Sequence, residues 1–187
     1  MSFLTPSEIE SKGFKYIGSN VRISRHATFY GAENISIGSN SRVDDFCVIS
    51  ASKLGITIGE YVHVAVFCCL TGGSLIQLDD FSGLSSRVAI YSSNDNYSGE
   101  FLTNPCVPSE FSGVSSAPVV LRKHVIVGTN STILPGVTIN QGAAVGAYSL
   151  VTNDIEESII AVGVPAKPVK KRKQNIFDLE KKLRASE

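Results

Sequence analysis

The sequence predicts an all-β chain folded as a triangular solenoid of about six coils, and three observations support this. First, eighteen positions recur at six-residue intervals, and every one carries an aliphatic side chain or Phe. Second, in two of the three columns a turn-prone residue usually follows. Third, the extra residues always fall after the third position of a coil. Three short strands per coil, with spare residues at one corner, describe a triangular prism.

The eighteen positions form three columns, one for each side of the prism. The first column is Ile17, Ile37, Ile58, Leu78, Leu121 and Ile139; the second is Ile23, Val43, Val64, Leu84, Val127 and Val145; the third is Phe29, Ile49, Leu70, Ile90, Ile133 and Val151. In a chain that is 43% apolar, fewer than about one random arrangement in a million would fill them all. We expect these side chains to face the interior, with coils stacked about 4.8 Å apart.

The corners of the prism are predicted from the residues beside the columns. Gly18, Gly38 and Gly59 follow the first column and are expected to adopt a left-handed or tight backbone where the chain turns. Small residues such as Cys47 and Cys68, four positions after a column residue, are expected to fill the space beside a corner. In a sandwich of short strands, irregular turns would interrupt the six-residue spacing of the apolar residues, and that spacing would not continue unchanged over whole coils. The solenoid is therefore preferred.

The chain divides into one domain with two short appendages. Residues 1–14 are polar, with Thr5 or Ser7 placed to cap a helix, and residues 15–165 form the solenoid. Residues 166–187 are a basic segment and a helix, which either closes the open end of the solenoid or belongs to a phosphate-binding rim. A long insertion after the fourth coil forms loop 91–118, which is too polar for a core and well placed to carry function.

The composition argues against several classes of protein. Seventeen basic residues balance seventeen acidic ones, so we do not expect an electrostatic nucleic-acid binder. The chain shows no long apolar run and no signal peptide, so we expect no membrane insertion. Its four cysteines lack the spacing of a disulfide framework or a zinc site, which indicates a reduced, cytoplasmic protein without a metal.

The segment from Leu134 reads LPGVTINQGAAVGAYSLVTND and is soon followed by AVGVPAKP. It resembles the closing coil of the hexapeptide-repeat acyltransferases, whose repeats build a left-handed parallel β-helix. The opening MSFLTPSEIESKGFKYIGSNVRIS and the loop sequence YSSNDNYSGEFLTNP resemble dTDP-4-amino-4,6-dideoxyglucose acyltransferases and related sugar O-acetyltransferases. The resemblance implies acetyl-CoA as co-substrate, a sugar or nucleotide-sugar acceptor, and a homotrimer with active sites between subunits.

The resemblance directs the search for a catalytic base to the loop. Sugar acetyltransferases of the galactoside and maltose type carry a His there, and Asp95 occupies that position here. A carboxylate is a weak base unless burial raises its pKa, so His63, expected to point into the groove between subunits, is a second candidate. We predict a His63–Asp95 pair, either within one chain or across the interface between subunits; the alternatives are an Asx turn at Asp95 and a plain interface role for His63. The acceptor is expected to bind Tyr91, Ser93, Asn94 and Asn104.

The resemblance also implies a path for CoA along the last coils. Glycines at 128 and 146 are expected to let the cofactor approach the backbone closely. The residues assigned to this path are Thr129, Ala147, Thr152 and Asn153 for the pantetheine arm and Lys170 for the 3′-phosphate, with Lys167, Lys171 or Arg172 as substitutes.

The sequence is compatible with four candidate functions. The first is acetyl transfer to the amine of a nucleotide-linked amino sugar in surface-polysaccharide synthesis, and the second is O-acetylation of a sugar hydroxyl. A hydroxyl needs a base more than a neutral amine does, so the missing loop His favours the amine. The third, a zinc enzyme of the carbonic anhydrase type, would need His26, His63 and His124 to converge, yet they lie on different coils. The fourth is a scaffold without catalysis, which would need neither the polar loop nor the basic tail.

Overall fold

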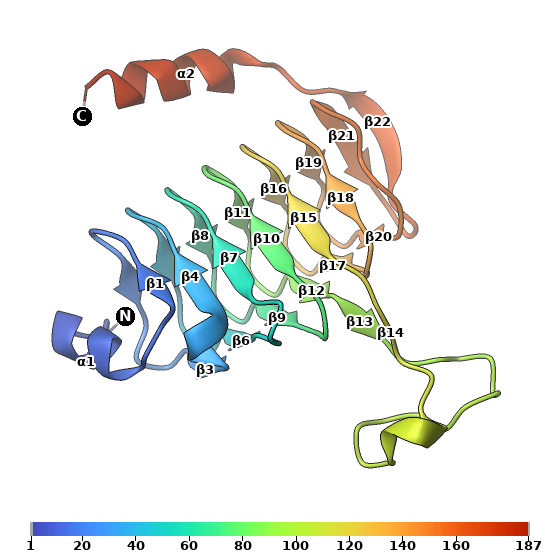
Figure 1. The fold of residues 1–187 in the computed structure, drawn as a ribbon. Helices are drawn as coiled ribbons and strands as arrows, with labels where there is room; N and C mark the ends of the chain where they lie inside the picture. The colour runs from blue at the N-terminus through green and yellow to red at the C-terminus, as the bar shows by residue number, and fades with distance from the viewer. Residues whose placement is uncertain (1, 187) are drawn as a thin grey trace.

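A computed structural model describes residues 2–186 and shows a triangular prism of stacked coils (Figure 1). Met1 and Glu187, the outer ends of the predicted terminal segments, lie outside the described residues. Each coil contributes one short strand to each of three faces, which contain six, eight and six strands. The prediction of about six coils is confirmed, and the second face continues into the start of a seventh.

The strands are short because a corner follows every two to four residues. The first face consists of β1 (Tyr16–Ile17), β4 (Ile35–Ile37), β7 (Ile56–Ile58), β10 (Ile76–Leu78), β15 (Val119–Leu121) and β18 (Thr138–Ile139). The second consists of β2 (Arg22–Ile23), β5 (Arg42–Val43), β8 (His63–Val64), β11 (Gly83–Leu84), β16 (Ile126–Val127), β19 (Ala144–Val145), β21 (Ile159–Val162) and β22 (Lys167–Lys171). The third consists of β3 (Thr28–Tyr30), β6 (Val48–Ser50), β9 (Cys69–Thr71), β12 (Ala89–Tyr91), β17 (Thr132–Ile133) and β20 (Leu150–Val151).

The predicted columns form the core. The neighbouring strands of the first face are parallel and in register, so Ile37 pairs with both Ile17 and Ile58. Sixteen of the eighteen column residues are at most 3% exposed. The exceptions, Ile17 and Phe29, lie in the first coil, where no further coil covers them, and are partly buried. Burial of each side chain contributes about 1.5–3 kcal/mol, which makes the columns the main source of stability.

The corners differ from the prediction. The left-handed residue is not the one that follows a column residue but the third after it, as at Asn20, Asn40, Tyr61, Phe81 and His124. The glycine that follows the column is needed for a different reason. A Cβ on the glycine at position 38 would lie 2.6 Å from the backbone carbon of the glycine at position 59 in the next coil. Glycine therefore permits close stacking of the coils rather than a left-handed turn.

Bulky side chains at these left-handed positions stack on one another from coil to coil. At the corner between the first and second faces, the rings of Tyr61 and Phe81 are parallel, with centroids 4.8 Å apart, and Phe81 stacks on His124 at 5.1 Å. At the corner between the second and third faces, Phe46 and Phe67 stack at 5.1 Å, and the Arg87 guanidinium lies 5.1 Å from the Phe67 ring. A left-handed backbone costs a non-glycine residue about 1–2 kcal/mol, and ring stacking offsets part of that cost.

Cys47 and Cys68 occupy the buried space beside a corner, as predicted. Their thiols donate to the carbonyl oxygens of Ala65 and Ser85 at 3.0 and 3.2 Å, so each thiol ties its corner to the next coil. Among the described residues, all four cysteines are free.

The N-terminal segment contains the short helix α1 (Pro6–Ser11), which is capped by Thr5 and not by Ser7. Thr5 and Glu8 form a capping box, and Arg25 from the first coil holds the Glu8 carboxylate. The hydrogen bond from Arg25, with those from Thr5, lowers the pKa of Glu8 to about 2. A 3-10 turn, η1 (Ala32–Asn34), occupies the spare corner of the first coil.

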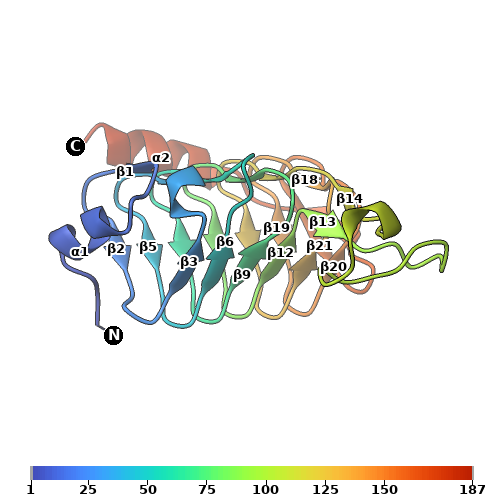
Figure 2. The ribbon, with the colours of Figure 1, turned by 60° about the horizontal axis from the view of Figure 1, so that its bottom comes forward.

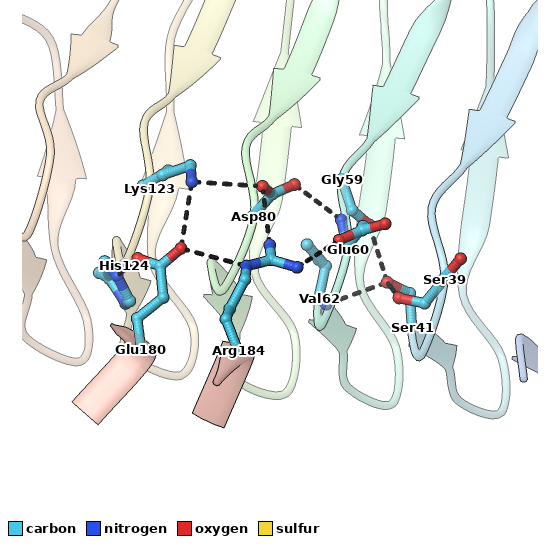
Figure 3. A network of polar contacts seen from close by, with 10 residues as sticks. All are labelled: Ser39, Ser41, Gly59, Glu60, Val62, Asp80, Lys123, His124, Glu180 and Arg184. Atoms are coloured by element: carbon cyan, nitrogen blue, oxygen red, sulfur yellow. Dashed lines mark hydrogen bonds and ion pairs between the residues drawn. The ribbon is translucent and has the colours of Figure 1, made fainter. Parts of the chain in front are cut away.

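The C-terminal helix α2 (Asn175–Arg184) does not cover the end of the prism. It runs back along the corner between the first and second faces (Figure 1). Figure 3 shows the ionic contacts that hold it: Arg184 reaches Glu60 at 2.8 Å and Asp80 at 3.4 Å, and Glu180 accepts from His124 at 2.6 Å. The antiparallel pair β21–β22 closes the second face instead.

The insertion leaves the corner between the third and first faces, after β12. Its base is a two-stranded ribbon in which β13 (Ser93–Asn94) pairs antiparallel with β14 (Ser115–Ser116), and a 3-10 turn, η2 (Ser109–Phe111), lies further out. The insertion projects away from the prism (Figure 2) and exposes large apolar side chains, including Tyr97 at 84%. It carries three acidic residues and no basic one.

Candidate active site

The insertion folds around a pocket of 520 Å³ that gathers four of the predicted site residues. Ser93, Asn94, Asp95 and Asn104 all line it, whereas Tyr91 lies outside it at the end of β12. The Asp95 carboxylate accepts a weak hydrogen bond of 3.4 Å from the backbone N–H of Asn104. Asp95 thus lies in a polar hollow with a carboxylate oxygen available to a ligand.

His63 lies on the outer side of β8, and its side chain is 51% exposed. Its Nε2 contacts the Asp44 carboxylate at 2.8 Å, and Asp44 itself is only 5% exposed. Arg42 donates to both oxygens of Asp44, at 2.5 and 3.1 Å. Burial raises the pKa of Asp44, but the hydrogen bonds from Arg42 and His63 outweigh it and hold that pKa below the ordinary value. Asp44 is therefore ionised at neutral pH.

The predicted His63–Asp95 pair does not form within one chain, where the partner of His63 is Asp44. His63 lies on the second face, and Asp95 lies on the insertion that leaves the corner between the third and first faces. Sequence reasoning missed Asp44, although one signal was available. Arg42 is the strand partner of His63, which lies one coil later. Asp44 lies two residues after Arg42, on the same side of the strand, so the coil length alone places Asp44 beside the imidazole.

Ser85 is a second residue that the sequence analysis did not single out. It follows β11 and occupies the same position in its coil as Ala65 and Asp44 do in the two preceding coils. Backbone hydrogen bonds fix this register: the N–H of Asp44 donates to the carbonyl of Val64, and the N–H of Ala65 donates to the carbonyl of Leu84. His63 pairs directly with Gly83, two residues before Ser85. Asp44, His63 and Ser85 therefore lie on three successive coils of one surface.

The residues assigned to CoA are mostly accessible. Ala147, Thr152, Asn153 and Lys170 are exposed, while the Thr129 hydroxyl is half-buried and donates to the carbonyl of Ser86 at 2.6 Å. The glycine at position 128 has a structural reason, because a Cβ there would lie 2.4 Å from the backbone nitrogen of Ala147. Close stacking of the coils therefore accounts for this glycine without the cofactor.

The basic residues of the C-terminal segment have two different roles. Lys167, Lys170 and Lys171 lie on the exposed strand β22. Arg172 instead donates to the carbonyl oxygens of His124, Gly142 and Ala143 at 2.8–3.2 Å. Burial lowers its pKa from the ordinary arginine value. Arg172 satisfies buried carbonyls at a corner, so it is not a substitute for Lys170 as a phosphate ligand.

The three histidines have separate partners. His26 stacks on Phe46, His63 contacts Asp44, and His124 contacts Glu180. Across residues 2–186, no group of three or more His, Cys, Asp or Glu side chains is arranged to hold a metal ion. In the same part of the chain, no helix has the length and apolar character needed to cross a membrane.

Comparison with curated proteins found extended similarity, although no family model matches the chain. The chain is 46% identical over 186 residues to the dTDP-4-amino-4,6-dideoxy-D-glucose acyltransferase of Escherichia coli, covering 100% of this chain and 97% of the relative. It is 34% identical over 146 residues to the putative lipopolysaccharide biosynthesis O-acetyl transferase WbbJ of Escherichia coli K12, covering 74% of this chain and 69% of that protein.

Comparison with solved structures found the same fold. A variant of AntD, an N-acyltransferase from Bacillus cereus, in complex with dTDP and coenzyme A has a TM-score of 0.96 and 41% identity, covering 100% of this chain and 99% of that one. AntD has also been solved with dTDP and 3-hydroxybutyryl-CoA. A maltose O-acetyltransferase from Clostridium difficile has a TM-score of 0.60 at 21% identity, covering 90% of this chain and 74% of that one, which shows a shared fold only. The predicted left-handed parallel β-helix is confirmed.

Proposed function

Because the chain belongs to the family of dTDP-4-amino-4,6-dideoxyglucose acyltransferases, we propose that it transfers an acetyl group from acetyl-CoA to the amine of a nucleotide-linked amino sugar. The observation that carries this is the 46% identity over 100% of the chain and 97% of the relative. AntD supports it, since a variant has been solved with dTDP-4-amino-4,6-dideoxyglucose and coenzyme A. The pathway we propose is surface-polysaccharide synthesis in the cytoplasm, where nucleotide sugars and acetyl-CoA are made.

Ser85 and Asp95 are the residues that we expect to contact the amine. The solved AntD variants replace one serine and one aspartate, and the numbers of those two positions differ by ten. Ser85 and Asp95 have that spacing, and no other aspartate of this chain has a serine ten positions before it. The carboxylate would hold the amine, and the hydroxyl would orient its lone pair toward the thioester carbonyl.

Ser85 and Asp95 can act on one amine only if they come from two copies of the chain. Within one copy, the third face separates them, and its strands advance about 3.3 Å per residue, which makes it roughly 15 Å wide. The insertion projects away from the prism (Figure 2). Its exposed apolar side chains, such as Tyr97 and Phe111, need a cover that the same chain does not provide. We therefore include in the proposal a homotrimer with active sites between subunits, as the resemblance implies.

CoA is expected to lie along the last coils of the prism, toward β22. The exposed residues Ala147, Thr152 and Asn153 and the half-buried Thr129 form this part of the surface. Lys170 would attract the 3′-phosphate as a point charge. Backbone N–H groups at regular spacing would stabilise the oxyanion that forms on the thioester carbonyl.

A thiol-release assay with acetyl-CoA tests the activity. Turnover is expected with dTDP-4-amino sugars, and failure on every amino sugar in a panel would refute the proposal. Turnover confined to sugar hydroxyls would favour O-acetylation instead, the alternative that the similarity to WbbJ supports. A second acyl donor, 3-hydroxybutyryl-CoA, should be included because AntD has been solved with it.

Mixing two inactive variants tests the placement of the site. Ser85→Ala and Asp95→Ala are each expected to lose most activity. If subunits are exchanged by unfolding and refolding a 1:1 mixture, each site has one chance in two of an intact serine and one in two of an intact aspartate. Activity should recover to about 25% of the unmutated enzyme. No recovery, with mixed trimers shown to be present, would mean that both residues act within one chain.

A further inference from the structure

We infer that Asp44 is a positioning residue for catalysis: it fixes the His63 ring so that Nδ1 is left unprotonated and accepts the proton from the acceptor amine. This inference rests on the proposed function. It differs from the sequence prediction, which gave the partner role to Asp95. It depends on the contacts of Asp44, on the space beside His63, and on the position of Ser85.

Asp44 determines which ring nitrogen carries the proton. An ionised carboxylate can only accept hydrogen bonds, so the 2.8 Å contact requires Nε2 of His63 to donate. Nδ1 is then the nitrogen with a free lone pair. The Arg42 guanidinium, bound to both oxygens, prevents Asp44 from turning away. Asp45, the next residue, is bonded to the Ser24 hydroxyl and is the other acidic group on this element.

The surface beside His63 is bordered by small residues and by Ile126. Toward the next coil, the pairing partner of His63 is Gly83, which has no side chain, and the Cδ1 atom of Ile126 lies 3.3 Å from where a Cβ of that glycine would be. The residue at the position of Ser85 in the preceding coil is Ala65, which is small and buried. Strands lie about 4.8 Å apart and outward residues of one strand about 6.6 Å apart, so the Cα atoms of His63 and Ser85 are roughly 8 Å apart on the diagonal. We place the acceptor amine between the imidazole and the hydroxyl.

The proton balance is complete with these groups. The amine nitrogen attacks the thioester carbonyl, and its proton passes to Nδ1 of His63, which becomes an imidazolium beside the Asp44 carboxylate. The C–S bond breaks, and the CoA thiolate leaves and takes a proton from the imidazolium. The products are the amide and CoA thiol. His63 returns to the neutral state in which Asp44 holds it.

Asp44→Asn tests the inference because Arg42 determines how the amide lies. Arg42 has only donors, so it takes the amide oxygen and leaves the NH₂ group facing His63. Nε2 must then accept, and the proton moves to Nδ1, the nitrogen that is meant to react. We expect kcat to fall about 100-fold, within the usual range for loss of a general base, with KM for acetyl-CoA unchanged. Asp45→Asn is the matched control and should stay within about twofold of the unmutated enzyme.

The ring can be observed directly, because the chain has three histidines. In the full-length protein labelled with ¹⁵N, long-range proton–nitrogen spectra report the tautomer of each, and His63→Gln assigns the signals of His63. We expect an Nε2–H ring in the unmutated protein and in Asp45→Asn, and an Nδ1–H ring in Asp44→Asn. The tautomer shows whether Asp44 sets the state of the ring, and the fall in kcat at unchanged KM shows whether that state matters for catalysis.

Three results would overturn the inference. In the first, Asp44→Asn keeps full kcat; in the second, its His63 ring remains Nε2–H. In the third, His63→Gln remains fully active; because His63 is exposed, this variant is expected to fold. The third result would leave the acyl transfer itself intact and remove only the role of His63. Failure of the unmutated enzyme on every amino sugar would instead refute the proposed function, and this inference with it.

Discussion

Replacing Glu180 by Gln is predicted to loosen helix α2 from the prism. The Glu180 side chain is 15% exposed and accepts from His124, which is 8% exposed, at 2.6 Å. Its contact with Lys123 at 3.1 Å is weaker in effect, since the lysine side chain is 41% exposed. Burial raises the pKa of Glu180, but the hydrogen bonds from His124 and Lys123 outweigh it and hold the pKa below the ordinary value.

The size of the effect follows from these exposures. A buried hydrogen bond to a charged group contributes about 1.5–3 kcal/mol, whereas a half-exposed ion pair contributes about 0–1 kcal/mol. Gln retains an oxygen that can accept from His124, so the expected loss is about 2 kcal/mol. At about 1.4 kcal/mol per factor of ten, the detached population of α2 should rise roughly thirtyfold.

The chain has no Trp, so Phe177→Trp provides a single fluorescent reporter on α2. The Phe177 ring lies edge-on to His124 at 5.2 Å. Urea titration of the reporter protein with and without Glu180→Gln measures the detachment. Hydrogen exchange of the α2 amides provides a second measurement in the chain without the reporter.

The pH dependence has a definite sign. A carboxylate whose pKa is lowered in the folded state stabilises it above the ordinary carboxyl pKa, and that contribution is lost as the pH falls through the lowered value. The difference in stability between the unmutated protein and the Glu180→Gln variant should therefore be full at pH 7 and disappear at strongly acidic pH. The control is Asp178→Asn on the same helix, because the Asp178–Lys181 pair is at least 75% exposed and should contribute little. An equal effect of both substitutions, or a difference that persists in acid, would refute the reasoning.

Three further predictions concern stability and ionisation. Leu70→Ala removes a fully buried column residue and should cost about 2–5 kcal/mol in urea unfolding; a loss below about 1 kcal/mol would contradict the column as the core. Gly128→Ala would place a Cβ 2.4 Å from the Ala147 nitrogen, so thermal unfolding should occur at a clearly lower temperature; an unchanged melting temperature would show that the coils can separate freely. The Glu8 carboxyl should titrate with a midpoint near pH 2 by NMR because of Arg25, and Arg25→Gln should move that midpoint upward; no movement would exclude Arg25 as the cause.

The fold was largely predictable because one physical rule repeats in every coil. Burial of one apolar side chain per strand fixes the period, the phase and the register, and the same rule located the insertion. The corners were predicted less well. The left-handed residue is the third after the column residue, whether it is Asn20, Tyr61 or Phe81. The glycine that directly follows the column instead allows close stacking on the next coil, a contact that leaves no local signal.

The candidate site was predictable only in part. Ser93, Asn94, Asp95 and Asn104 do converge on one pocket, because they share a single polar insertion. Within one chain the partner of His63 is Asp44 and not Asp95, and Asp44 is an ordinary corner residue by its sequence context. Recognising it requires counting one coil backward from the histidine rather than searching for a motif.

The strand β22 affects whether molecules associate end to end at high concentration. A stack of parallel coils has no natural end, and an open strand edge can pair with the edge of another molecule and grow into a fibre. The second face ends in an antiparallel strand that carries Pro168 and three lysines, all exposed. Proline lacks an N–H to donate, and lysines repel an identical edge, so this strand terminates growth. Removing residues after 166 should therefore leave an enzyme prone to end-to-end polymerisation, even where the remaining coils fold correctly.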